Sequence, residues 1–169
     1  MVDIILLQTV SILVTSAGLL FAALYYVLQI RHQTRLRQTD LAMRLFSTWG
    51  SKEFRDMVIE VHSLQFKDYD DFVKKYGPWF SKGPAQTAIG TVANYFEAIG
   101  FLVYKKIIDI DFIYNVITFT SIKLHWEKVK PVMMGLRELH SDPRIGLWIE
   151  YLYNEMEKYD QKLQAKKGQ

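Results

Sequence analysis

Glu97 is the residue whose type and surroundings are best suited to chemistry. It follows Asn94 by three residues, on the flank of an apolar helical pattern over residues 85–105. A carboxyl group on an apolar helix can have a raised pKa, which is a property of general acids and bases. Two other interpretations stay open: an ion pair with an Arg or Lys of a neighbouring helix, and simple exposure to solvent. No catalytic motif accompanies Glu97, so we do not expect an enzyme.

Trp126 and Glu127 form a second pairing of an aromatic and an acidic residue, with Arg137 further along the chain. Tryptophan is highly buried on average, so we expect Trp126 in the core. We expect the charges of Glu127 and Arg137 at helix ends, where they would interact with the helix dipole.

The residues that usually hold metals or cofactors lack the necessary spacing. The histidines are scattered, without a His-x-x-x-His or His-Glu-x-x-His pattern, at His32, His62, His125 and His140. The sequence has no cysteine, which excludes disulfides, thiolate zinc sites, iron–sulfur clusters and a cysteine nucleophile. No glycine-rich phosphate loop and no Gly-x-Ser-x-Gly motif occurs. We therefore expect no metal and no cofactor.

Trp79 and Phe80 are two large aromatic residues in an expected loop, between Gly77-Pro78 and Gly83-Pro84. Aromatic residues in loops can anchor a protein interface, or can enter the headgroup region of a membrane beside Lys82. A third interpretation is that they fold back over the core of their own domain. Trp79 and Phe80 are thus possible partner contacts.

Apolar residues recur at intervals of three and four over residues 51–156, which predicts an all-α fold. We expect about five helices, over residues 51–64, 68–76, 85–105, 110–140 and 143–156. Pro131 should end or kink the fourth of these near Lys130. The residues expected to face inward in the last three helices are Ile89, Val92, Phe96, Ile99, Val103, Ile113, Val116, Ile117, Thr120, Leu124, Ile145, Trp148, Ile149, Leu152 and Met156.

Residues 4–28 carry no formal charge and are followed at once by a basic flank. About 20 mainly apolar residues suffice for a helix to cross a bilayer, so this stretch is long enough to span. A cleavable signal peptide would have a positive start and a shorter apolar core, whereas here Asp3 leads. A buried core helix is the remaining alternative. The basic flank predicts that the amino terminus lies outside and the bulk of the chain in the cytoplasm.

Polar and small residues form one stripe along this predicted span. Their spacing of three and four residues indicates a helix–helix interface in the membrane, with a second copy or with another membrane subunit. The alternative is that the hydroxyls bond to their own helix and the small residues have no partner. The stripe consists of Gln8, Ser11, Thr15, Gly18, Ala22, Tyr25 and Gln29.

The net charge of +3 resides entirely in residues 31–44. The basic residues there are Arg31, Arg35, Arg37 and Arg44, against Asp40, and the rest of the chain has 17 basic and 17 acidic groups. A basic segment directly after a span suits anionic lipid headgroups. A nucleic-acid-binding protein would show a basic face on its folded domain, so we expect no nucleic acid as a partner.

These patterns divide the chain into four parts. We expect a transmembrane anchor at residues 1–30 and a juxtamembrane helix at 31–50. A cytoplasmic helical domain should follow at 51–158, and a polar carboxyl-terminal tail at 159–169. Nothing breaks a helix between residues 29 and 49, so the span should continue into the helical bundle.

Several short motifs follow one another along the chain in an order that carries a resemblance to a family. They are Gln29-Ile30-Arg31, Ser51-Lys52-Glu53-Phe54-Arg55, Asn94-Tyr95-Phe96-Glu97-Ala98-Ile99-Gly100 with Leu102-Val103, Trp126-Glu127 with Pro131, and Asp142-Pro143-Arg144 with Tyr151-Leu152. In these motifs the chain resembles an uncharacterised family of bacterial and archaeal proteins known only as a domain of unknown function. The resemblance implies one amino-terminal span and an all-helical cytoplasmic domain. It implies no site residues, and the chain departs from the family pattern at residues 67–82 and after Glu157.

The expected function is that of a membrane-anchored interaction or scaffold protein in the inner (cytoplasmic) membrane. Its partners would be the lipid bilayer and either a second copy or another membrane protein, as a homo-oligomer or an accessory subunit. The alternative is a membrane-associated signalling or defence effector whose domain senses a ligand. An enzyme that uses Glu97 is a third, less favoured possibility.

Overall fold

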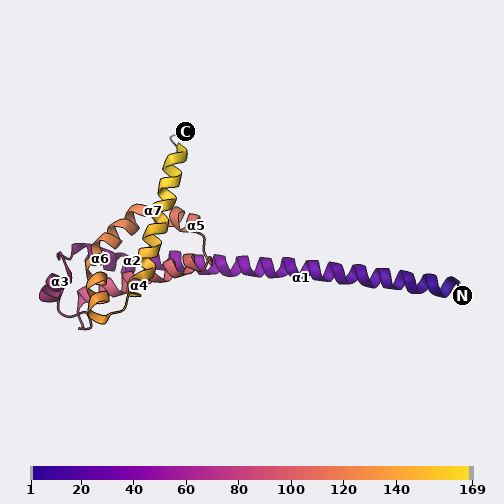
Figure 1. The fold of residues 1–169 in the computed structure, drawn as a ribbon, viewed down its shortest axis with the longest axis horizontal. Coiled ribbons are helices and arrows are strands. Elements are labelled where there is room, and N and C mark those ends of the chain that lie inside the picture. Colours follow the sequence, from indigo (N-terminus) through magenta and orange to yellow (C-terminus); the bar gives the residue numbers. More distant parts are fainter. Residues whose placement is uncertain (1, 168–169) are drawn as a thin grey trace. The chain divides into compact units, whose positions relative to one another are not determined.

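The computed structural model describes residues 2–167, with side chains except at Val2, Arg35 and Lys167. Within this range every regular element is an α-helix, and no strand occurs. The helices are α1 (Val2–Gly50), α2 (Lys52–Ser63), α3 (Tyr69–Tyr76), α4 (Pro84–Tyr104), α5 (Ile110–Val116), α6 (Phe119–His140) and α7 (Leu147–Lys167) (Figure 1). The predicted all-α fold is confirmed, with six helices after α1 instead of about five.

The chain divides into two compact units, residues 1–43 and residues 44–169. The first unit is helical throughout its described residues and belongs to α1. The second unit contains the end of α1 and the helices α2 to α7, and we refer to it as the helical bundle.

Helix α4 supplies the central apolar stripe of the helical bundle. Its five predicted inward residues are all buried, at Ile89, Val92, Phe96, Ile99 and Val103. The helix packs most extensively against α7 and also against α2. Full burial of a large apolar side chain stabilises a fold by about 1.5–3 kcal/mol, so this stripe contributes substantially to the stability of the bundle.

The predicted starts of the two short helices that follow α1 are also confirmed. The Ser51 side chain accepts a hydrogen bond from Phe54 N at 3.2 Å, and the Asp68 side chain accepts one from Asp71 N at 2.8 Å. Helix α3 ends at Gly77, whose φ of 91° favours glycine. These caps fix where α2 and α3 begin, because each satisfies a backbone donor that the helix itself leaves free.

The prediction of a single helix over residues 110–140 is wrong, because the structure has two helices there, α5 and α6. Helix α5 ends at Val116, and Ile117 adopts an extended conformation with φ −117° and ψ 119°. Thr118 then caps α6, its hydroxyl accepting a hydrogen bond from Ser121 N at 3.3 Å. A β-branched residue with a hydroxyl group is a weak helix former and a good N-cap, which explains the break.

This break changes which residues of α6 face the core. The inward positions predicted at Thr120 and Leu124 are wrong, since both are exposed, Leu124 by 53%. Ile122 and Trp126 are buried instead. The prediction extended one helical period through Thr118. Because α6 starts in a different register, that period assigns the wrong residues of α6 to the core.

Of the two outcomes predicted for Pro131, an end of the helix or a kink, the first does not occur, because α6 continues to His140. A proline inside a helix removes one backbone hydrogen bond and crowds the preceding turn. Here the residues on both sides are anchored in the core, since Val129, Val132 and Met133 are buried. Their packing maintains the helix across the missing bond.

Candidate functional site

Residues that the sequence singled out separately meet at one cavity of the helical bundle. The cavity has a volume of about 370 Å³ and lies between α4, α6 and the loops at residues 77–83 and 141–146. The residues in its lining that sequence reasoning had singled out are Trp79, Phe80, Asn94, Glu97 and His140. We call it the Glu97 cavity.

Glu97 is engaged with the backbone of α7. Its carboxylate accepts hydrogen bonds from Trp148 N at 3.1 Å and from Ile149 N at 3.0 Å, in the first turn of that helix. Burial raises the pKa of Glu97, while these two bonds and the positive charge of Arg137 act in the opposite direction. The carboxylate therefore serves as a cap that joins α4 to the amino end of α7, where a negative charge is favoured. Neither simple exposure nor a direct ion pair describes it.

Arg137 lies in the last turn of α6, as predicted, and its hydrogen bonds are made within the bundle. Its guanidinium donates to the Ile145 carbonyl at 2.6 Å and to the Glu150 carboxylate at 2.8 Å. Trp126 is buried, which confirms its expected place in the core. The prediction for Glu127 is wrong, because it lies in the middle of α6, exposed and 3.9 Å from Lys123.

Trp79 and Phe80 occupy different environments. Trp79 is half-buried, with its ring 6.5 Å from that of Phe72, so the folded-back interpretation holds for this residue. Phe80 is 81% exposed, and its ring makes a T-shaped contact with that of His140, at 5.6 Å between ring centroids. Of the two aromatics, Phe80 is the one with free surface for a partner.

Gln86 fixes the loop that carries these aromatics. Its side-chain amide donates to the Tyr76 carbonyl at 2.7 Å, to the Pro78 carbonyl at 3.2 Å and to the Ser81 hydroxyl at 3.0 Å. Gln86 is itself buried, so these bonds are shielded from water. The loop is therefore held in place by one side chain of α4.

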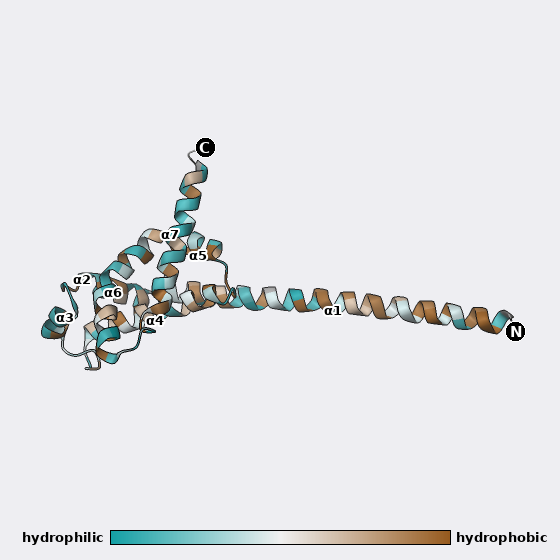
Figure 2. Ribbon diagram, viewed as in Figure 1, coloured by the Kyte–Doolittle hydropathy of each residue, from teal (hydrophilic) through white to brown (hydrophobic). Residues whose placement is uncertain are grey.

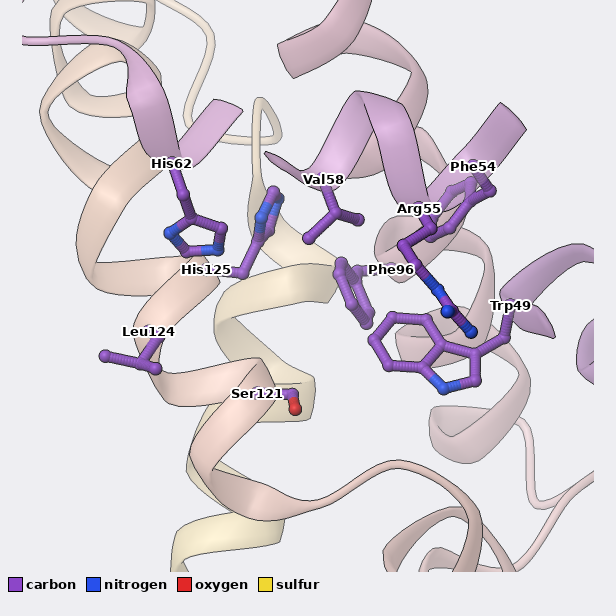
Figure 3. A pocket seen from close by; sticks show the side chains of 9 residues that line it. All are labelled: Trp49, Phe54, Arg55, Val58, His62, Phe96, Ser121, Leu124 and His125. Atoms are coloured by element: carbon purple, nitrogen blue, oxygen red, sulfur yellow. The ribbon is translucent and has the colours of Figure 1, made fainter. Parts of the chain in front are cut away.

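A second cavity was not predicted from the sequence. It has a volume of about 300 Å³ and is lined by Trp49, Phe54, Arg55, Val58, His62, Phe96, Ser121, Leu124 and His125 (Figure 3). Two of the histidines regarded as scattered thus meet here, one from α2 and one from α6. We call it the His125 cavity.

His125 is the most unusual residue of this cavity. It is 1% exposed, and neither ring nitrogen has a hydrogen-bond partner among the described residues. Its ring lies 5.0 Å from that of Phe96 and 5.9 Å from that of His62 (Figure 3). Burial lowers the pKa of His125 to about 3, so the imidazole is neutral at physiological pH. Burial also lowers the pKa of His62, with a smaller contribution from Lys128.

The described residues offer no cluster of three or more His, Cys, Asp or Glu side chains that could hold a metal ion. Glu97 and His125 lie in separate cavities, and His140 also lines the first while His62 also lines the second. Both cavities can offer hydrogen bonds and apolar contacts to a bound molecule.

In the first unit, α1 is long and apolar enough to span a membrane, with a mean hydropathy of 2.1 over its most apolar 18 residues. Figure 2 shows that the hydrophobic residues gather in its amino-terminal half. Every described side chain of residues 3–40 is exposed, which includes the predicted stripe. Arg31, Arg37 and Arg44 are exposed as well, and the Arg35 side chain lies outside the described residues.

The stripe residues do lie on one side of the helix. At 3.6 residues per turn the seven positions fall within an arc of about 100°. The Thr15 hydroxyl donates to the Ser11 carbonyl at 2.8 Å, so it is satisfied within its own helix. Apart from its chain neighbours and the adjacent backbone of α1, no described atom lies within 4 Å of the place a Cβ would occupy at Gly18.

Together, these features define a class: an all-helical bundle in a chain that begins with an exposed apolar helix. The chain belongs to the DUF4760 family, a domain of unknown function whose family model matches residues 12–156. The matched region includes most of the apolar part of α1 and both cavities. No curated protein and no solved structure matches the chain significantly.

Proposed function

We propose that this protein is a membrane-anchored interaction protein that acts as a homo-oligomer or as an accessory subunit of a membrane complex. The observation that carries the proposal is the exposed apolar run of α1. Side chains such as Leu7, Leu20 and Phe21 are 73%, 67% and 71% exposed, along a helix whose apolar window has no buried residue. Exposed apolar surface of this extent marks a membrane or protein contact.

The proposed topology is a single span in the inner membrane with the amino terminus outside. The support is the asymmetry of the flanks, with Asp3 on one side and Arg31 and Arg37 on the other. The helical bundle would then face the cytoplasm, and the arginines would contact anionic headgroups.

The stripe on α1 would provide the contact within the membrane. Association of spans depends on close backbone approach and polar pairs, because lipid gives no hydrophobic driving force. Gly18 and Ala22 are the small residues that permit such an approach. Since no described atom beyond the adjacent part of α1 lies near the place of a Cβ at Gly18, the space there is open to a partner helix.

Cross-linking in native membranes tests this proposal with two matched variants. Gly18→Leu places a bulky side chain on the stripe and should abolish the cross-linked species, whereas Ala17→Leu, a small-to-large change on the other side of α1, should leave it intact. Both variants should insert and fold normally, because both positions are exposed. A protein that never cross-links, or whose cross-linking Gly18→Leu does not change, would contradict the proposal.

A ligand-responsive membrane effector is the second candidate. The His125 cavity favours it, because a buried polar group without a partner is characteristic of binding sites. If the chain acts on the membrane, overexpression should depolarise cells, and mutation of the stripe should remove this effect. Overexpression without any change in membrane potential would exclude this candidate.

A further inference from the structure

We infer that the His125 cavity binds a small aromatic carboxylate, held between α2, α4 and α6. The inference rests on the bundle alone and does not depend on the proposed membrane role. Three features of the cavity point to this ligand: one cation and one buried imidazole, neither with a hydrogen-bond partner among the described residues, and aromatic walls.

Arg55 provides the charge complementarity. In the part of the chain that the structure describes, its guanidinium makes no ion pair and no hydrogen bond to another side chain. None of the nine lining residues is acidic (Figure 3). Arginine presents donors in a planar fork that matches the two oxygens of a carboxylate. The cavity therefore favours one negative charge on its ligand.

His125 provides a second polar contact at the inner wall. A neutral imidazole has one N–H donor and one acceptor nitrogen. In His125 neither of these two nitrogens has a hydrogen-bond partner among the described residues. Both ring nitrogens are closed to water in the structure, so a ligand oxygen would accept from the N–H after the His125 ring turns toward the cavity. The neighbouring His62 ring, 5.9 Å away, is the other imidazole able to contact the same group.

The remaining walls are apolar and largely aromatic. Phe96 and Trp49 lie 5.9 Å apart between ring centroids, and Phe54 lies at the same distance from Trp49 (Figure 3). Such walls favour a flat ring, through stacked or edge contacts. A volume of about 300 Å³ is at the small end of known ligand pockets, so the ligand is small.

Isothermal titration of the full chain in lipid nanodiscs tests the inference, with 2-naphthoate as the probe and neutral 2-naphthamide as its isostere. Empty nanodiscs correct for partition into lipid. We expect 2-naphthoate to bind about tenfold more tightly than the amide, because only the carboxylate has the negative charge and the two equivalent oxygens that pair with both arms of the Arg55 guanidinium. No binding of either compound, or equal affinity for both, would overturn the inference.

Two substitutions on α2 then locate the binding site. Arg55→Gln should reduce the affinity for 2-naphthoate about tenfold and leave that for 2-naphthamide unchanged. Lys52→Gln removes the same charge from the same helix outside the cavity lining, and should change neither affinity. Equal effects of the two substitutions would show a general charge effect and would contradict a site in this cavity.

His125→Phe separates a ligand-binding role from a structural one. We expect it to weaken binding of 2-naphthoate severalfold while it raises the melting temperature of the unliganded protein, because it removes buried polar atoms without partners. A lower melting temperature would instead show that His125 is satisfied within the fold, and would contradict its assigned role. The Arg55→Gln result stands whether or not this variant folds.

Discussion

Replacing Glu97 distinguishes its role as a helix cap from a role in chemistry. Glu97→Ala removes both oxygens that accept from Trp148 N and Ile149 N, at 3.1 and 3.0 Å. Glu97→Gln keeps one carbonyl oxygen within reach of these donors and removes only the charge. If Glu97 is a cap, the two variants should differ strongly in their free energy of unfolding. If it is a catalytic carboxylate that contributes nothing to the fold, they should have the same free energy of unfolding.

The magnitude follows from the two donors. A partly buried donor left without a partner costs about 1–3 kcal/mol, and loss of a cap costs about 0.5–2 kcal/mol. We expect Glu97→Ala to lower the free energy of unfolding of the helical bundle by about 2 kcal/mol. For a unit of about 125 residues this corresponds to a melting temperature about 7 °C lower. Glu97→Gln should stay within about 1 kcal/mol of the wild type at pH 7.

The pKa of Glu97 gives the expected pH dependence. Burial raises this pKa above its ordinary value of 4.5, so the folded state binds the proton more tightly than the unfolded state. The resulting stabilisation is fully present below pH 4.5 and is lost as the pH rises through the higher folded-state pKa. Glu97→Gln lacks this titration, so it should become more stable relative to the wild type as the pH increases from 4 to 8.

Urea unfolding of the full chain in detergent, followed by near-ultraviolet circular dichroism, measures both effects. This signal reports the packing of aromatic side chains in the bundle. Unchanged stability of Glu97→Ala would refute the capping role. A wild type that gains stability over Glu97→Gln as the pH rises would show that the bonds to α7 outweigh desolvation, and would refute the sign of the pKa shift.

Three further predictions concern other contacts of the bundle. Gly100→Ala should destabilise it by about 1–3 kcal/mol in urea unfolding, because the added Cβ would overlap the Trp148 carbonyl; a neutral result would show that the α4–α7 contact can relax. Gln86→Leu should accelerate limited proteolysis in the loop at residues 77–83, because the loop loses its buried donor; unchanged cleavage would contradict this. The Arg144 guanidinium holds the pKa of Asp142 at about 2. The ionised Asp142 should therefore stabilise the fold above about pH 4, and this stabilisation should be lost as the pH falls toward 2. The acid unfolding curve of Asp142→Asn should lack this step.

The core of α4 and the helix caps could be predicted because their signals are local. An uninterrupted apolar stripe over 21 residues assigns one face of α4 without knowledge of its neighbours. Ser51 and Asp68 precede their helices with the side chains that satisfy free backbone donors. In both cases the residues that decide the structure lie within a few positions of one another.

The missed break between α5 and α6, and the continuation of α6 through Pro131, occur where local signals compete with packing. Ile117 and Thr118 continue the helical apolar pattern, yet Thr118 is also a suitable N-cap, and the structure uses it as one. Pro131 is a strong helix breaker by itself, but buried neighbours hold α6 together across it. Tertiary contacts decide such cases, and they cannot be read from spacing alone.

The contacts of the candidate site residues also depend on the tertiary structure and could not be predicted from spacing. Glu97 stood out because a carboxylate interrupts an apolar helix, but its partners are backbone N–H groups of α7, which have no signature in a sequence. The His125 cavity combines residues of α1, α2, α4 and α6. No spacing rule connects residues on four different helices, so only the folded chain shows that Arg55 and His125 line one cavity.

The cost of His125 is the strongest reason to assign a role to its cavity. A buried polar group without a partner costs about 1–3 kcal/mol, in a domain whose total stability is of the order of 5–15 kcal/mol. Phe96 and Trp126 show that large aromatic side chains are accommodated in the same core, where an apolar residue at position 125 would avoid this cost. Departures from good core packing are expected mainly at functional sites, where binding compensates for lost stability. A ligand that supplies the missing hydrogen bond would remove the penalty on binding, so the affinity for the ligand and the instability of the empty cavity have the same origin.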